Sequence, residues 1–418
     1  MTRSHPLPPA RRTAYTPAML DIDEPRHYRV ALLHLGFRPF FLLAGLAAGA
    51  LMAAWAVIYL LGTTLPPGGQ LPPAWWHGHE MIFGYAMAVI AGFLLTAVRN
   101  WTGVQTLHGW PLLLLALLWL LARVMPFLGH PAALTAMAAA DLAFGLGLAA
   151  ALLAPIARVR QWKQLFIWAL LVLLIGANAL FYAGLFVGDD TMFLVQRALL
   201  GGLYLVIALI LLMGRRVIPF FIEKGVGEGP PPRNRAWLDL SLNLLLLAFI
   251  LLEVFDQLPG LLAVLALALA VLHGVRLGGW HHPGIWRRPL LWILFLAYAW
   301  IIIGFALRAI AFFVPLGAFL PLHAFAAGGI GLMTLGMMAR VALGHTGRNV
   351  FEPPRVLGWM FALAVAAVVL RVVPPLFTTE LYKVWIGASQ GLWILAFSLF
   401  FIVYAPMLIR PRVDGRYG

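Results

Sequence analysis

Residues 38–61 read RPFFLLAGLAAGALMAAWAVIYLL, and no charged side chain follows Arg38 within this stretch. A helix that crosses a lipid bilayer needs about 20 consecutive, mostly apolar residues, because it rises only about 1.5 Å per residue. The stretch also lacks the alternation of polar and apolar residues that marks a strand of a membrane β-barrel. Within a bilayer, a helix satisfies its backbone hydrogen bonds inside one segment. The sequence therefore predicts a membrane-spanning helix here.

Further apolar runs follow along the chain, separated by clusters of proline, glycine and charge. The run at 259–275 is the shortest and stands at the lower length limit for a span. Together the runs predict an all-α, polytopic membrane protein with about 12 transmembrane helices. The remaining runs cover about 77–98, 110–128, 133–154, 164–187, 192–213, 237–256, 289–313, 320–343, 356–373 and 384–409.

The composition agrees with this fold class. Of 418 residues, 63% are hydrophobic and 11% are charged, whereas soluble domains carry about 45–50% apolar and about 25% charged residues. Secreted, fibrous and nucleic-acid-binding proteins are therefore excluded. The chain contains no cysteine, which excludes disulfides, thiolate-bound metals and cysteine nucleophiles. Any metal must be held by histidine, methionine, a carboxylate or a cofactor ring.

Positive charge marks one side of the predicted bundle. Of 29 Lys and Arg residues, 24 fall on the side that carries both chain ends when the runs alternate in direction, and five fall on the other. Lysine and arginine gather in cytoplasmic loops, so we predict that both termini are cytoplasmic. Residues 1–29 contain no apolar segment and are not typical of a signal peptide.

These counts define the expected organisation of the chain. We predict a cytoplasmic N-terminal tail at 1–37, one transmembrane domain at 38–410 and a cytoplasmic C-terminal tail at 411–418. Halves at 38–213 and 237–410 are joined by a cytoplasmic loop at 214–236, although the halves show no convincing repeat of one another.

Histidines gather at the start of two predicted spans on the outer side. His77 and His79 begin the second span in the sequence WWHGHEM (75–81), and His323 begins the tenth. Imidazole is the usual ligand of haem iron and a common ligand of copper. Residues two apart point about 200° away from each other on a regular helix, so His77 and His79 cannot chelate one ion. Either the helix is unwound at His77, or the two histidines serve different centres.

We take His79 and His323, from different spans, as the natural metal-binding or axial pair. Glu80 is a further candidate ligand, and Trp76 is a candidate cofactor contact. The alternative is that these histidines and tryptophans are anchors at the level of the lipid headgroups.

A second cluster lies at the cytoplasmic side. His345 ends the tenth span, about 33 Å along the helix from His323, so the two cannot share one centre. His34 is the candidate partner of His345 by depth. The alternatives are a histidine that caps the helix end, and arginines that bind anionic lipid. The arginines expected to hold haem propionates here are Arg38, Arg340 and Arg348.

Charged residues inside the spans are costly and are functional by default. We expect Arg308 and Arg371 to neutralise Glu80, Asp141 or a propionate; ion pairs between helices are the alternative. Several glycines thin the tenth span, either for close contact between helices or for a flat macrocycle. These glycines are Gly328, Gly329, Gly331 and Gly336.

Four blocks of sequence resemble the NnrS family. They are GFRPFF (36–41), WHGHEM (76–81), AGFLLTAVRNWTG (91–103) and GLMTLGMMARVALGHTGR (331–348). The resemblance implies a multi-pass protein of the bacterial inner membrane that takes part in nitric oxide metabolism and contains haem and copper. It also implies that the metal ligands are drawn from His77, His79, His323 and His345. The family often has proline where this chain has Arg99, so Arg99 is not carried over as a functional residue.

The expected function is a haem b protein, with copper as a second metal, that binds or turns over nitric oxide and protects against nitrosative stress. Reduction of nitric oxide to N2O would require electrons from quinol or a cytochrome, because the chain has no CxxCH haem-attachment site. The expected partners are nitric oxide and membrane lipid, with no nucleic acid. Two alternatives are a twelve-helix transporter and a haem- or copper-handling assembly factor. No catalytic residue can be named from the sequence.

Overall fold

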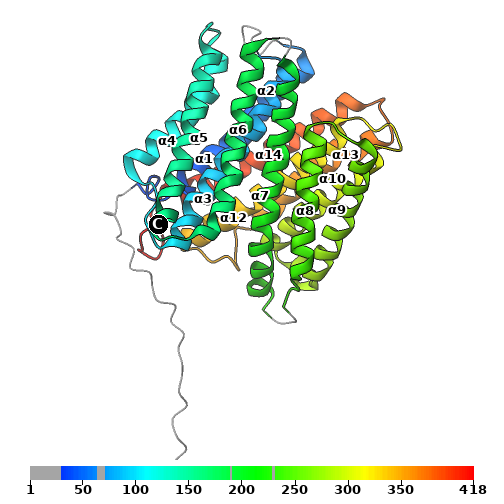
Figure 1. The fold of residues 1–418 in the computed structure, drawn as a ribbon. Helices are drawn as coiled ribbons and strands as arrows, with labels where there is room; N and C mark the ends of the chain where they lie inside the picture. The colour runs from blue at the N-terminus through cyan, green and yellow to red at the C-terminus, as the bar shows by residue number, and fades with distance from the viewer. Residues whose placement is uncertain (1–29, 64–70, 189–190, 228–230) are drawn as a thin grey trace, which may run out of the picture.

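The computed structural model describes residues 30–63, 71–188, 191–227 and 231–418, and these ranges contain helices and no strand (Figure 1). Twelve helical segments within them are long and apolar enough to cross a membrane. The predicted all-α, twelve-span fold is therefore confirmed. In chain order the spans are α1 (Phe37–Leu61); α2, η1 and α3 (Pro73–His79, Glu80–Ala86, Met87–Thr102); α4 and η2 (Gly109–Val124, Met125–Leu128); α5 (Ala133–Arg158); η3 and α6 (Trp162–Gln164, Leu165–Val187); α7 (Met192–Val226); α8 (Ala236–Val254); α9 (Pro259–Trp280); α10 (Pro289–Ile310), preceded by η5 (Pro283–Arg287); α11, η6 and α12 (Phe319–His323, Ala324–Gly331, Leu332–His345); α13 and η7 (Val356–Val372, Pro374–Leu376); and α14 (Tyr382–Ile409).

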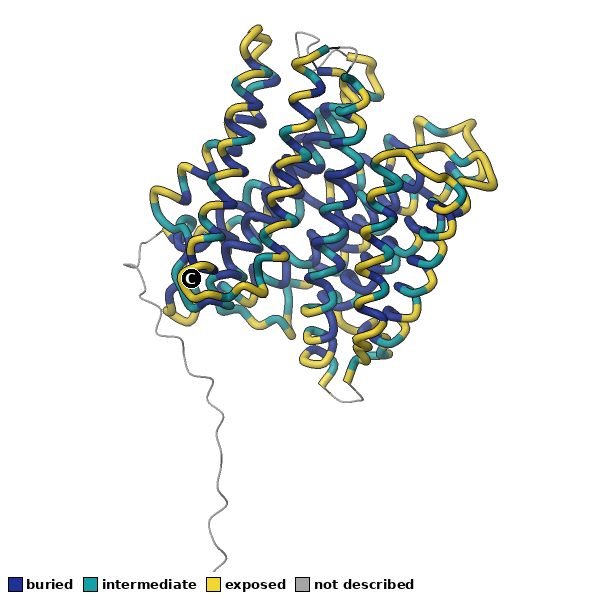
Figure 2. The backbone as a smooth tube through the Cα atoms, in the orientation of Figure 1, coloured by how far each residue is buried: buried dark blue, intermediate teal, exposed yellow. Residues whose placement is uncertain are grey.

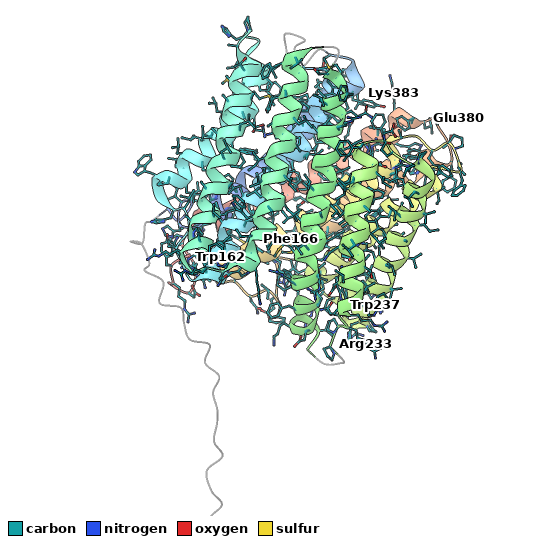
Figure 3. All side chains as sticks on the ribbon, viewed as in Figure 1. Trp162, Phe166, Arg233, Trp237, Glu380 and Lys383 are labelled. Carbon is teal, nitrogen blue, oxygen red and sulfur yellow. The ribbon has the colours of Figure 1, made fainter. Side chains whose placement is uncertain are left out.

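The bundle has two ends, which we name by the helices that meet there. The terminal face is the end at which α1 begins and α14 ends; Ala31 N donates to Ile409 O across it at 2.8 Å. The far face is the opposite end. Figure 3 shows Glu380 and Lys383 at the far face, and Arg233 and Trp237 at the terminal face. Which face meets the cytoplasm stays a prediction from the Lys and Arg count.

The second and tenth spans form the centre of the bundle. In these spans 83% and 78% of the apolar window is buried, against 67% or less in every other span. Figure 2 shows this buried interior running through the middle of the molecule. The two spans meet where the hydroxyl groups of Tyr85 and Thr334 lie 2.6 Å apart. Both also contain a π-helix, η1 and η6, and each π-helix directly follows a histidine.

Helix α7 extends beyond the span predicted from the apolar run. It continues to Val226 and includes Pro219, so the predicted loop at 214–236 is largely helical. The apolar count ended where charged residues begin, but the amphipathic pattern continues, because Ile218 and Ile222 are buried one turn apart. Gly225 then packs against Leu291 of α10.

Helix α9 is also longer than predicted. The apolar run ended at residue 275, but the helix continues to Trp280 and thereby has 22 residues. The extension carries Arg276, whose guanidinium is buried and donates to Asp239 of α8 at 2.6 Å. A cation with a carboxylate partner can stay inside the bundle, which a count of apolar residues does not detect.

Candidate functional site

His79 lies at the end of α2 inside a buried polar network. Its Nε2 is 2.9 Å from Asn178 Oδ1 and 3.3 Å from Asp141 Oδ2, and its Nδ1 is 3.3 Å from Glu80 Oε1. All four side chains are buried. Because both ring nitrogens face acceptor oxygens, the arrangement suits an imidazolium that donates from each nitrogen. Such a ring has no lone pair to offer a metal.

Arg123 of α4 completes this network. Its Nε lies 2.9 Å from Glu80 Oε2, and one terminal nitrogen lies 2.7 Å from Asp141 Oδ2. The Tyr182 hydroxyl donates to the same Asp141 oxygen at 2.8 Å. Two carboxylates therefore face two cations, Arg123 and His79, so the buried charges balance. We call these residues, with Asn178, the span-2 network.

The arginine that neutralises Glu80 and Asp141 is thus not one that the sequence indicated. We expected Arg308 or Arg371 there, but Arg308 pairs with Glu253 of α8 at 2.8 Å. The expected alternative, an ion pair between helices, is the correct one for Arg308. Spacing along the sequence does not reveal which helices become neighbours, and that decides the partner.

His323 lies at the end of α11, directly before the π-helix η6. Its Nδ1 is 2.8 Å from the carbonyl oxygen of Phe319. An Arg371 nitrogen, which can only donate, lies 3.1 Å from the same Nδ1. The carbonyl accepts a proton from Nδ1 whereas Arg371 offers one to it, so the two contacts favour opposite tautomers of the ring. In the tautomer that donates to Phe319, Nε2 is unprotonated, and no described residue donates to it. Histidines that bind metals usually donate their other ring N–H to a carbonyl or carboxylate in this way.

His77 shares the far-face environment of His323. It lies within the regular helix α2, so the unwound turn that we considered is absent. Its ring stacks on Trp55 of α1, with centroids 4.6 Å apart and planes 7° apart. Its Nδ1 is buried and has no hydrogen-bond partner within the part of the chain that the structure describes. His77 and Arg371 both lie within electrostatic range of His323. His77 therefore shares the charged surroundings of His323, whereas His79 has a different set of contacts.

Other buried polar atoms in this part of the molecule also have no partner among the described residues. Both amide atoms of Gln390 and the Nε1 of Trp385 are buried and unpaired on α14. Helices α14 and α2 both pack against α1, which carries Trp55. Buried polar groups are nearly always hydrogen-bonded, so an unpaired group calls for water or a ligand. Trp76, the candidate cofactor contact, is fully buried and packs against Phe127. Its Nε1 also has no partner among the described residues.

The predicted cytoplasmic cluster lies at the terminal face. The His34 ring stacks on Tyr417 with centroids 4.7 Å apart, and the half-buried His345 ring lies 5.5 Å from that of Phe37. The carbonyl of His345 accepts from Arg412 at 2.9 Å. Residues 411–418, predicted as a tail, are therefore packed against this face rather than extended away from it. The pairing of His345 with His34 on a metal stays a prediction.

The arginines expected to hold propionates have distinct environments. Arg38 is fully buried and donates to Leu408 O at 2.7 Å, Arg410 O at 2.8 Å and Gly418 O, so it caps the end of α14. Burial and the nearby Arg410 lower the pKa of Arg348. Arg340 lies over the ring of Phe221. The propionate role stays a prediction for all three.

The histidines and carboxylates of the described residues suit one of the expected cofactors better than the other. Within the described part of the chain, no three or more histidine and carboxylate side chains are grouped to hold a metal ion. A metal centre with several carboxylate and histidine ligands does not fit these residues. Haem needs only one or two imidazoles, and His323 with His77 meets that requirement. Copper would need donors beyond this pair.

A family model described as "NnrS protein" matches residues 31–412, which is nearly the whole chain. The chain belongs to the NnrS family. This family is associated with the response to nitric oxide. Among curated proteins, none matches the chain closely enough to count as a relative.

The blocks that resemble the NnrS family map onto the centre of the bundle. GFRPFF opens α1, WHGHEM crosses the junction of α2 and η1, and AGFLLTAVRNWTG forms most of α3. The fourth block forms α12 after η6. In this NnrS-family chain, the glycines of η6 contact neighbouring side chains: Gly328 meets Trp300, Gly331 meets Trp393. They permit close helix packing, the first of the two interpretations above.

Proposed function

We propose that this NnrS-family protein binds haem near the far face through His323 and His77, and that it binds nitric oxide there. One observation carries the proposal: the Nδ1 of His323 lies 2.8 Å from the Phe319 carbonyl oxygen, and donation to that oxygen leaves Nε2 as a ligand nitrogen. His77 is the second ligand, because its buried Nδ1 gives up no hydrogen bond when it binds a metal. Haem held by both histidines would have no vacant position on its iron, so nitric oxide would bind there by replacing His77.

The surroundings of the pair suit this role. Arg371 lies beside His323 and is the nearest cation for a propionate. The walls are helices with lipid-facing apolar residues, which a small neutral gas can cross from the bilayer. We infer that the protein lies in the bacterial inner membrane with its terminal face towards the cytoplasm.

Turnover is a further step that the chain cannot make alone. Reduction of two nitric oxide molecules to N2O and water consumes two electrons and two protons. Those electrons must come from a quinol or a cytochrome, since the described residues include no redox-active cysteine. Binding is therefore the proposed basal function.

The first experiment is an absorption spectrum of the purified full chain from haem-replete cells. We expect a Soret band, reducible α and β bands, and a spectral shift of the ferrous form with nitric oxide. His77→Ala should change the spectrum while some haem remains on His323. Wild-type protein that carries no haem, or whose ferrous spectrum does not respond to nitric oxide, would rule the proposal out.

A transporter is the second candidate, and the span-2 network favours it. Buried charges beside a π-helix resemble the interrupted helices that bind substrates in secondary transporters. Haem-free protein that moves a solute across proteoliposome membranes would support this alternative. The assembly-factor alternative instead predicts substoichiometric haem that exchanges readily with free haem.

A further inference from the structure

A cavity of about 60 Å³ opens at the terminal face, apart from the histidines. It lies between the end of α7, the start of α10 and the segment that follows α12. Three of its lining residues are arginines, namely Arg287, Arg288 and Arg340, and none is acidic. The cavity therefore concentrates positive charge without an internal counter-charge.

Arg340 of α12 is the most informative of the three. Its side chain is only 9% exposed, and its guanidinium lies 3.8 Å from the centroid of the Phe221 ring. Among the described residues, no hydrogen bond or ion pair reaches this guanidinium. Other buried arginines do have such partners: Arg123 binds Asp141, and Arg276 binds Asp239. A buried cation without an anion is costly, so an anion from outside the chain is expected beside Arg340.

The backbone of the cavity reinforces this preference. Helix α10 is 22 residues long and begins at Pro289, so its N-terminus faces the cavity. Pro289 has no N–H, and the N–H groups of Leu291 and Trp292 donate to Arg288 O. The feature that favours an anion at this end is therefore the positive end of the helix dipole. Such a dipole favours phosphate and other oxyanions.

The surroundings place the cavity at the edge of the bilayer. Arg340 stands five residues before the end of its span, while Trp286 and Phe351 nearby are about half exposed. Aromatic residues gather where the membrane meets water. The acidic residues closest along the chain, Glu223 and Glu352, are exposed and do not line the cavity.

We propose that this cavity binds a phosphate group, supplied either by the headgroup of an anionic phospholipid or by free phosphate. Guanidinium groups bind phosphate oxygens in pairs through short, charge-assisted hydrogen bonds. Arg340 would bind from the buried side, and Arg287 and Arg288 from the exposed side. The site is independent of the haem proposal, because it uses neither His77 nor His323.

The test uses purified, delipidated full chain in detergent. One arm titrates inorganic phosphate calorimetrically; the other adds phosphatidylglycerol and counts retained lipid by native mass spectrometry. Arg340→Gln should weaken binding about tenfold or more, because it removes a charge-assisted contact. The matched control is Arg235→Gln, which removes an exposed charge at the same face outside the cavity. If Arg340→Gln does not fold, the exposed pair Arg287→Gln and Arg288→Gln replaces it.

Each result decides the proposal. If Arg340→Gln weakens only the binding of phosphatidylglycerol, the cavity is a site for a lipid headgroup. If it weakens the binding of inorganic phosphate, the cavity is a site for free phosphate. The proposal fails if wild-type protein binds neither, or if Arg235→Gln weakens binding as much as Arg340→Gln. It also fails if Arg340→Gln keeps phosphate binding but loses haem absorbance, which would make the anion a propionate.

Discussion

The second and tenth spans begin alike and yet surround their histidines differently. Each starts at the far face, passes through a histidine and continues as a π-helix. In the second span, His79 faces carboxylate and amide oxygens on both nitrogens. In the tenth, the Nδ1 of His323 faces a backbone carbonyl and a guanidinium, and its Nε2 has no partner among the described residues. The same local pattern therefore produces a structural cation in one span and a candidate metal ligand in the other.

The source of the difference is the neighbouring helices. α4, α5 and α6 supply Arg123, Asp141 and Asn178 to the second span. α13 supplies Arg371 to His323, and no described carboxylate contacts this histidine. A π-helix widens one turn and often accompanies function, but the side chains opposite it determine the chemistry.

The largest expected effect is on the stability of the span-2 network. Arg123→Met leaves Glu80 and Asp141 buried without their guanidinium, and breaking a buried ion pair costs about 3–5 kcal/mol. We expect little folded protein, measured as the fraction that elutes as a monodisperse peak in detergent. Arg371→Met is the matched control, because Arg371 has no carboxylate partner among the described residues. Equal recovery of the two variants would contradict the contrast between the spans.

The sequence was sufficient for the fold but only partly for the site. Twelve apolar runs and the count of Lys and Arg predict the helices, because burial in lipid requires long apolar segments. The choice between His77 and His79 needs the rotational phase of α2 against α1, which spacing alone does not provide. The role of Arg123 was missed, since a charge within an apolar run identifies no partner until the neighbouring helices are known.

A smaller effect is expected when the π-helix of the second span is crowded. A Cβ at Gly84 would lie 2.8 Å from a terminal nitrogen of Arg123 and 3.0 Å from Glu80 Oε2. Gly84→Ala should therefore cost about 1–3 kcal/mol, as overpacking does, measured by thermal unfolding. Gly391→Ala on α14 is the control, because nothing lies within 4 Å of the added carbon. A Gly84→Ala melt as high as that of the control would show that the network is loosely packed.

The hydroxyl contact between the second and tenth spans should contribute modestly to the free energy of unfolding. Tyr85→Phe removes the hydroxyl that lies 2.6 Å from Thr334 Oγ1, but Thr334 keeps its bond to Ile330 O at 2.7 Å. We expect a loss of about 0.5–1.5 kcal/mol in thermal unfolding with haem content unchanged. Loss of haem in Tyr85→Phe would mean that the contact between Tyr85 and Thr334, and not His323 alone, positions the cofactor.

The smallest expected effect lies outside both spans and serves as a reference. Arg412 donates to Asp414 and holds the pKa of this carboxyl below its usual 3.8. A depressed pKa means that the ion pair stabilises the packed C-terminal segment above about pH 4 and is lost as the pH falls further. Asp414→Asn should speed proteolysis within 410–418 at neutral pH without changing the thermal midpoint of the bundle. Unchanged cleavage would show that Tyr417 and Arg38 hold the segment without this pair.

The central claim is that His323 is a ligand and His79 is a structural cation. Absorption spectra and thermal melts of His323→Ala and His79→Gln, purified in parallel, test it most directly. The account predicts that His323→Ala loses the Soret band with a melt close to that of haem-free wild type. His79→Gln should keep the Soret band and unfold at a clearly lower temperature. A His79→Gln protein that loses haem, beside a His323→Ala protein that keeps it, would contradict the account.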